Sequence, residues 1–325
     1  MFRRGLALAL AFCGIALPAS AAPYPDHAIR MIVPFAAGGG TDVLARIIAQ
    51  HLNSKWGQPV VVENQPGASG SIGTRAVMKA TPDGYTLLMA STGSLMTVSA
   101  GAGEDAAFDV SKYLAPIAVG AAPPYLLVVN PALQVSSIAE LIRLARQRPE
   151  GLTYGSSGVG AASHLSGLLF ANETGITLLH IPYKGTGPAV TDLIGGRIDM
   201  MFAPGPVVAQ FVQSGQLKAL GITDTRRSRF YPDLPTVSES GVPGYESVGW
   251  FGLLAPANTP PEIVRQINEA IVAAMDMKEF RDHLATLGAE PKPLTPDEFA
   301  RYINADVAKW SKLVKDNAIQ LPGGK

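Results

Sequence analysis

The chain has 325 residues, and its 26 basic and 26 acidic side chains give it a formal net charge of zero at pH 7. Without an excess of basic residues the chain offers little attraction to nucleic acid or to an anionic membrane, and we expect neither as a partner. Cys13 is the only cysteine, which excludes a disulfide framework within the chain.

The first 21 residues have the pattern of a secretory signal peptide. The pair Arg3-Arg4 precedes an apolar run over residues 6–17, and Ala19-Ser20-Ala21 offers the small residues of a cleavage site. The run is shorter than the roughly 20 apolar residues that span a bilayer. We therefore expect residues 1–21 to be removed on export to the periplasm, which leaves a mature chain without a thiol.

In the mature chain, strand-like apolar runs alternate with stretches of helical spacing. The predicted strands cover residues 29–35, 60–63, 86–90, 126–129, 178–183 and 217–223. The predicted helices cover residues 43–52, 138–146, 165–169, 260–275, 278–287 and 295–318. Strands separated by helices of this length predict an α/β fold in which mostly parallel sheets are flanked by helices.

Two segments are candidate crossings between lobes, namely Pro123-Pro124 and residues 249–256. A glycine-rich turn between a strand and a helix occurs near the start of the mature chain and again after Leu152. We expect two similarly built lobes, one formed by residues 22–124 and 251–325 and the other by residues 125–250, in a monomeric protein.

The two glycine-rich turns carry the strongest functional signal. Residues 34–42 read PFAAGGGTD, and residues 154–164 read YGSSGVGAASH. Glycines let a ligand approach the main chain closely, and the N–H groups at a helix start bind anions. Ser156, Ser157 and Ser163 add hydroxyl donors to the second turn. Because open α/β sheets bind ligands beyond the carboxyl ends of their strands, the turns predict a site for a small anion.

Other chemistries fit the sequence less well. Neither turn has the third glycine of G-x-G-x-x-G, and G-x-x-x-x-G-K-[ST] does not occur, so we expect no nucleotide and no other cofactor. The adjacent Ser163 and His164 raise the alternative of an exported hydrolase, but the sequence has no G-x-S-x-G motif, and we do not expect an enzyme. The remaining histidines lack metal-ligand spacing, so packing or surface roles are assigned to His27, His51, His180 and His283.

Two charged residues near the turns have several possible roles. Asp42 can act as a base, bind a ligand ammonium group or favour the helix start through the helix dipole. Lys184 can face either a ligand or solvent.

Ordered stretches of the sequence also resemble a known family. They are YPDHAIRMIVPFAAGGGTDVLARIIAQHL, WGQPVVVENQPGASGSIGT, TPDGYTLLMAS, LTYGSSGVGAASHL, HIPYKGTGPAVTDLIGGRIDMMF, LKALGIT, PDLPTVSESGVPGYE and WFGLLAPANTP. On these stretches, which cover nearly the whole mature chain, the sequence is similar to the Bug or TctC-like substrate-binding receptors of tripartite tricarboxylate transporters.

The resemblance implies a two-lobed periplasmic binding protein of the Venus-flytrap, type II-like kind, which holds a small carboxylate between its lobes. The ligand would be a di- or tricarboxylate, an aromatic acid or an acidic amino acid, delivered to the membrane permease of a tripartite transporter. The alternative is a sensory protein that presents the same ligand to a membrane sensor kinase.

Carried onto matching positions, the resemblance also implies a set of ligand contacts. The set contains Phe35, Ala37, Gly38, Gly39, Thr41 and Asp42 in the first turn, Ser156, Ser157, Gly158, Ala161, Ser163 and His164 in the second turn, and Ser91, Thr92, Tyr183, Lys184, Phe202 and Ala203 at the border of the cleft. Ala203 stands where many relatives have a polar or acidic residue, and residues 94–105 depart from the family pattern. The ligand of another member therefore need not be the ligand here.

Overall fold

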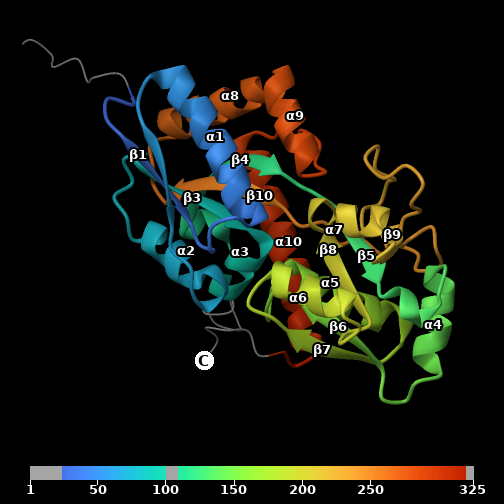
Figure 1. Cartoon of the computed structure of the whole chain (residues 1–325). Helices are drawn as coiled ribbons and strands as arrows, with labels where there is room; N and C mark the ends of the chain where they lie inside the picture. Colours follow the sequence, from blue (N-terminus) through green and yellow to red (C-terminus); the bar gives the residue numbers. More distant parts are fainter. Residues whose placement is uncertain (1–23, 100–108, 320–325) are drawn as a thin grey trace, which may run out of the picture.

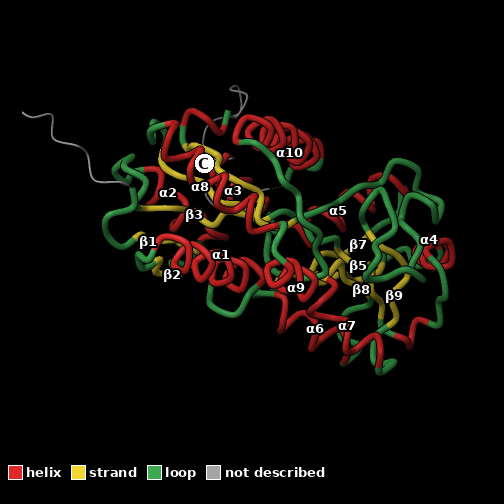
Figure 2. Tube along the Cα trace, turned by 90° about the horizontal axis from the view of Figure 1, so that it is seen from above, coloured by secondary structure: helices red, strands yellow, loops and turns green. Residues whose placement is uncertain are grey.

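The computed structural model describes residues 24–99 and 109–319, which form two lobes (Figure 1). The predicted signal peptide and residues 100–105 of the atypical segment lie outside the described residues. Each lobe contains one five-stranded sheet flanked by helices. Seen from above, the two halves lie side by side and loop segments pass between them (Figure 2). Within the described ranges, no helix combines the length and the apolar composition that a membrane crossing needs.

The sheet of the first lobe has the strand order β2-β1-β3-β10-β4. β1 (Ile29–Val33) pairs in parallel with β2 (Val60–Asn64) and with β3 (Thr86–Ser91). β10 (Phe251–Pro256) lies antiparallel between β3 and β4 (Leu114–Ala121). A strand from late in the chain is therefore inserted between strands from its first half.

The sheet of the second lobe repeats this arrangement in the order β7-β6-β8-β5-β9. β6 (Leu152–Ser156) pairs in parallel with β7 (Leu178–Pro182) and β8 (Met200–Pro204). β5 (Tyr125–Val129) lies antiparallel between β8 and β9 (Lys218–Ile222). In each sheet, one strand runs antiparallel to both of its neighbours. This strand is the first one after the chain crosses from the other lobe: β5 comes directly after β4, and β10 comes directly after β9. The predicted two-lobed α/β fold with mostly parallel strands is confirmed.

Helices connect the strands in both lobes. The first lobe contains α1 (Gly40–Trp56), η1 (Ala68–Gly70), α2 (Ser71–Met78), α3 (Thr92–Ser99), η3 (Val110–Lys112), α8 (Pro261–Met275), α9 (Lys278–Thr286) and α10 (Pro296–Asp316). The second lobe contains η4 (Pro131–Leu133), α4 (Ile138–Arg146), α5 (Ala162–Thr174), α6 (Thr186–Ile194) and α7 (Gly205–Gln213).

The predicted elements agree with these bounds, but α2, α3, α6 and α7 are not among the predicted helices. Each predicted strand begins and ends within two residues of the bounds of an observed strand, and each predicted helix overlaps an observed helix. However, β4 and β8 are not among the predicted strands, and residues 251–256, which were expected to cross between lobes, form β10. The run FGLLAP is apolar throughout because β10 is a central strand with a partner on each side.

Both faces of each sheet are buried. In β1, Met31 and Val33 belong to the hydrophobic cluster on one face, and Ile32 belongs to the cluster on the other. In β5, Leu127 and Leu126 divide in the same way. This two-sided burial follows the alternation of side chains along a strand, and it leaves the loops beyond the strand ends as the place for a ligand site.

Candidate ligand-binding site

The first glycine-rich turn joins β1 to α1 and is closed by the carboxylate of Asp42. This carboxylate accepts hydrogen bonds from the Gly38 N–H (2.9 Å), the Arg46 guanidinium (3.0 Å) and the Asn64 amide (2.9 Å). Burial alone would raise its pKa, but the bonds from Arg46, Gly38 and Asn64 hold the pKa of Asp42 below the ordinary value. Of the three roles considered for Asp42, that of an acid at the helix start agrees best with these bonds, which in addition close the turn.

The start of α1 keeps main-chain donors for a ligand. Val43 N–H is bonded to the Gly39 carbonyl at 3.0 Å. The N–H groups of Gly39, Gly40 and Thr41 have no acceptor in the part of the chain that the structure describes. Such groups lie at the positive end of the helix dipole, so they suit a carboxylate.

The second glycine-rich turn joins β6 to α5. Three of its main-chain N–H groups are hydrogen-bonded to side chains of the same segment. The bonds run from Ser157 N–H to Ser163 Oγ (3.0 Å), from Gly158 N–H to Ser156 Oγ (3.1 Å) and from Gly160 N–H to His164 Nδ1 (3.0 Å). Among the described residues, the N–H groups of Val159, Ala162 and Ser163 have no acceptor. The donors that remain for a ligand are therefore fewer than the sequence suggests, and they centre on the start of α5.

His180 on β7 contacts this turn, although the sequence alone assigns it a packing or surface role. Its Nε2 lies 2.6 Å from Ser156 Oγ, and its ring stacks on the His164 ring with the centroids 4.0 Å apart. Burial lowers the pKa of His164 to about 3, with a smaller contribution from His180. Burial likewise lowers the pKa of His180 to about 4. Both imidazoles are therefore neutral at physiological pH.

The two neutral histidines predict that the protein loses stability in mild acid. Their pKa values of about 3 and about 4 lie below the unfolded value of about 6.5, so below that pH the unfolded chain binds protons that the native protein does not. We expect the free energy of unfolding to be about 2.7 kcal/mol lower at pH 5.5 than at pH 7.5 through these two groups. Urea unfolding at both pH values measures this difference.

The double variant His164→Asn/His180→Asn should lack this part of the pH dependence, because it cannot titrate at either position. His283→Asn is the matched control, since His283 lies on α9, outside this cluster. A pH dependence that is the same in the wild type and in the double variant would contradict the assignment.

The second turn reaches the first lobe at η1 and α3. Ser69 Oγ donates to the Val159 carbonyl at 3.3 Å. A methyl group placed on Gly93 would lie 3.5 Å from Ala161 Cα, so the start of α3 also touches the second turn. A methyl group on Gly70, next to Ser69, would lie 3.1 Å from the ring of Phe35, which belongs to the first turn. Both glycine-rich turns therefore border the same region between the lobes.

Ser91 and Thr92, at the start of α3, use their hydroxyls within the protein. Ser91 N–H donates to Ser94 Oγ at 3.0 Å, and Ser94 N–H donates to Ser91 Oγ at 3.4 Å, which closes the first turn of the helix. Thr92 Oγ1 accepts from Trp250 N–H at 3.4 Å. Both residues border the contact between the lobes, but their hydroxyls have protein partners.

Four further residues of the expected set have side chains directed elsewhere. Phe202 is fully buried and packs in the hydrophobic cluster of β5 and α5, and Ala203 is buried in the cluster on the opposite face. The Tyr183 hydroxyl donates to Asp192 on α6 at 2.9 Å. Lys184 is exposed and forms no ion pair within the described ranges. We therefore centre the candidate site on the two turns rather than on these side chains.

The Ser163 and His164 side chains do not form a nucleophile–base pair. Ser163 Oγ accepts from Ser157 N–H and lies 3.1 Å from Ser157 Oγ, whereas His164 Nδ1 accepts from Gly160 N–H. The motivation for a hydrolase is thus removed. No group of three or more potential metal ligands occurs in residues 24–99 and 109–319.

Asp306 on α10 joins the elements at the crossing between the lobes. Its two carboxylate oxygens accept from the indole N–H groups of Trp250 and Trp310, each at 2.7 Å. Burial raises the pKa of Asp306, although these hydrogen bonds oppose the shift. Trp250 directly precedes β10, so this carboxylate joins the crossing segment to α10.

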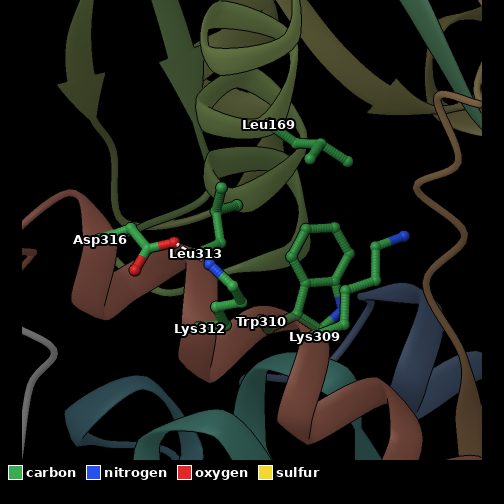
Figure 3. A pocket seen from close by; sticks show the side chains of 6 residues that line it. All are labelled: Leu169, Lys309, Trp310, Lys312, Leu313 and Asp316. Atoms are coloured by element: carbon green, nitrogen blue, oxygen red, sulfur yellow. Dashed lines mark hydrogen bonds and ion pairs between the residues drawn. The ribbon is translucent and has the colours of Figure 1, made fainter. Parts of the chain in front are cut away.

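α10 also contacts the second lobe. Lys309 Nζ donates to the Glu246 carbonyl at 2.5 Å. Figure 3 shows a pocket of about 180 Å³ between α5 and α10, lined by Leu169, Lys309, Trp310, Lys312, Leu313 and Asp316. None of the turn residues lines this pocket, and we place no ligand in it.

Two α/β lobes whose glycine-rich helix starts border a common region define the class of two-lobed solute-binding proteins. The chain belongs to the tripartite tricarboxylate transporter receptor family, whose sequence model matches residues 44–319. The resemblance noted in the sequence is thereby confirmed. The family and the fold are those of solute-binding receptors rather than of enzymes.

Individual relatives extend over almost the entire chain. The protein is 38% identical over 312 residues to protein BugT of Bordetella pertussis, which covers 96% of both chains. It is 37% identical to R. palustris Rpa4515 solved with adipate, with a TM-score of 0.79 and coverage of 91% of this chain and 98% of that one. It is 31% identical to MatC of Rhodopseudomonas palustris with bound malate, with a TM-score of 0.79 and coverage of 90% and 100%.

Proposed function

We propose that this protein is a periplasmic receptor that captures a small organic acid between its two glycine-rich turns and delivers it to the permease of a tripartite transporter. The observation that carries the proposal is the pair of helix starts with unpaired N–H groups, one in each lobe, that border the same region. The adipate and malate bound by two relatives support an acid of this size. A dicarboxylate is the first candidate, ahead of a tricarboxylate, an aromatic acid or an acidic amino acid.

The unpaired main-chain donors can supply the affinity of such a receptor. Each turn offers at least three N–H groups without an acceptor among the described residues. A hydrogen bond to a charged group contributes roughly 1.5–3 kcal/mol, and a micromolar site needs about 8 kcal/mol after the costs of ordering. Four to six bonds divided between the lobes reach this value, and only a closed lobe pair makes all of them.

The proposal includes the division of the chain. Residues 1–21 would be the export signal, residues 22–124 with 251–325 the first lobe and residues 125–250 the second. The sheet membership of β5 to β9 and the bridge between Pro124 and Val248, where the two crossing segments run side by side, support these limits.

Thermal unfolding with a panel of acids tests the proposed function. Adipate, malate, citrate, benzoate and glutamate would each be added to the mature protein at millimolar concentration. A ligand at 100 times its dissociation constant stabilises the native state by about 2.7 kcal/mol, so we expect at least one acid to raise Tm by about 5 °C or more. Adipamide, which has the shape of adipate without its charges, is the matched control and should leave Tm unchanged. An unchanged Tm with every acid would refute the proposal.

A further inference from the structure

The shape of the second glycine-rich turn depends on side-chain acceptors. The N–H groups of residues 157, 158 and 160 are bonded to Ser163, Ser156 and His164, respectively. These bonds turn three main-chain donors inward, and they leave the N–H groups of Val159 and of the first residues of α5 for a ligand. Two of the turn glycines, Gly158 and Gly160, have φ values of +140° and +80°, which other residues rarely adopt. The turn therefore needs its acceptors in fixed positions.

His180 holds two of the three acceptors from outside the turn. Its Nε2 lies 2.6 Å from Ser156 Oγ, and its ring stacks on that of His164 at 4.0 Å with an interplanar angle of 13°. Tyr154 lies next in the stack, with its centroid 4.9 Å from that of His180. His180 reaches these partners because the parallel register of β6 and β7 places it opposite Tyr154.

The hydrogen-bond roles in this cluster are nearly fixed. His164 Nδ1 accepts from Gly160 N–H, so the proton of this imidazole is on Nε2. Ser156 Oγ accepts from Gly158 N–H, and its single proton goes either to the Gly158 carbonyl at 3.1 Å or to His180 Nε2. A flat ring and a hydrogen-bonding nitrogen are both needed at position 180, and histidine provides both.

We infer that His180 is a positioning residue for anion capture: through Ser156 and His164 it holds the second turn in the shape that leaves the N–H groups of Val159, Ala162 and Ser163 free. This inference rests on the proposed function. His180 does not contact the ligand itself but acts through the turn.

Two substitutions separate the two contributions of the ring. His180→Phe keeps a flat ring for stacking on His164 and loses the bond to Ser156, whereas His180→Gln keeps a polar partner for Ser156 and loses the stack. We expect each variant to bind the acid that most stabilises the wild type in the panel about tenfold more weakly. Since His180 acts through Ser156, the double variant His180→Phe/Ser156→Ala should bind no more weakly than the weaker of its two single variants. His283→Gln is the control and should bind as the wild type does.

Amide hydrogen exchange without ligand gives a readout that is independent of binding. In His180→Phe and His180→Gln, the N–H groups of residues 158 and 160 should exchange at least about tenfold faster than in the wild type, while β1 and β3 in the other lobe should exchange as before. Circular dichroism shows whether each variant is folded. If one variant does not fold, the other carries the test.

The outcomes separate this inference from the proposed function. Unchanged exchange in the turn overturns the inference, and weaker binding with unchanged exchange would mean that His180 contacts the ligand directly. Faster exchange with unchanged affinity would also overturn it, because the shape of the turn would then not matter for capture. A wild-type protein that binds no acid of the panel refutes the proposed function and the capture role with it, while the exchange rates still decide whether His180 holds the turn.

Discussion

Replacement of Asp306 by alanine lowers the free energy of unfolding by about 3 kcal/mol. The substitution leaves the indole N–H groups of Trp250 and Trp310 without their common acceptor. A buried donor without a partner costs about 1–3 kcal/mol. Asp306 helps to line an adjoining pocket of about 160 Å³. Water in this pocket can partly replace the lost acceptor, so we expect a destabilisation near the lower end of the sum of these penalties. Urea unfolding at pH 7 measures the change.

Two further variants control for the loss of a carboxylate on α10. Asp316→Ala removes an exposed carboxylate whose ion pair among the described residues is with Lys312, and it should change the stability by less than about 0.5 kcal/mol. Asp306→Asn keeps one acceptor oxygen and should lie between alanine and the wild type. Because Trp250 and Trp310 are two of the three tryptophans, the emission spectrum of the native protein should shift in Asp306→Ala. Equal stabilities of Asp306→Ala and Asp316→Ala would contradict a stabilising role for the hydrogen bonds of Asp306 to Trp250 and Trp310.

Replacement of Gly93 by leucine weakens acid binding by at least about 100-fold. The added side chain would occupy the space in which Ala161 and the Gly160 carbonyl approach α3, so the lobes could not reach this contact. With the lobes held apart, the ligand would contact the donors of one turn only. Loss of two bonds to a charged group, at roughly 1.5–3 kcal/mol each, accounts for a change of this size. Isothermal titration with the panel acid that most stabilises the wild type measures the affinity.

Gly93→Ala is the matched control for the leucine variant. Its methyl group would lie 3.5 Å from Ala161 Cα, an ordinary van der Waals contact, and we expect its affinity to remain within about threefold of the wild type. Small-angle scattering should show that the acid compacts the wild type and Gly93→Ala but not Gly93→Leu. Binding by the leucine variant as tight as that of the alanine variant would show that this contact plays no part in closure.

Local patterns in the sequence predict most of the fold. Continuous apolar runs mark strands buried on both faces, and Thr295 with Glu298 forms the capping box that starts α10. The similar Thr259 does not cap α8, since its hydroxyl donates to the Pro256 carbonyl. The segment that forms β10 is predicted to cross between the lobes, because its sequence does not indicate that a further strand lies between β3 and β4 in the sheet. Strand insertion depends on tertiary packing, which local spacing does not record.

The candidate site is predicted less completely than the fold. The two turns are predicted from their glycines, their serines and their position before a helix. The sequence does not show which of their N–H groups are hydrogen-bonded within the protein. Phe202 illustrates a second limit: side chains alternate along β8, yet the sequence does not indicate which face meets the core cluster of β5 and α5. The role of His180 depends on the register between β6 and β7, which joins it to Ser156 across 24 positions of sequence.

The insertion of β10 between β3 and β4 has a consequence for biogenesis. Synthesis proceeds from the N-terminus, and β5 to β9 are consecutive in the chain, so a nascent chain that has reached residue 250 contains every strand of the second sheet. At that stage β3 and β4 lack the strand that joins them, and their unpaired edges are open to aggregation. The lobe that is translated first is therefore the lobe that matures last, and its final assembly waits for the C-terminal quarter of the polypeptide.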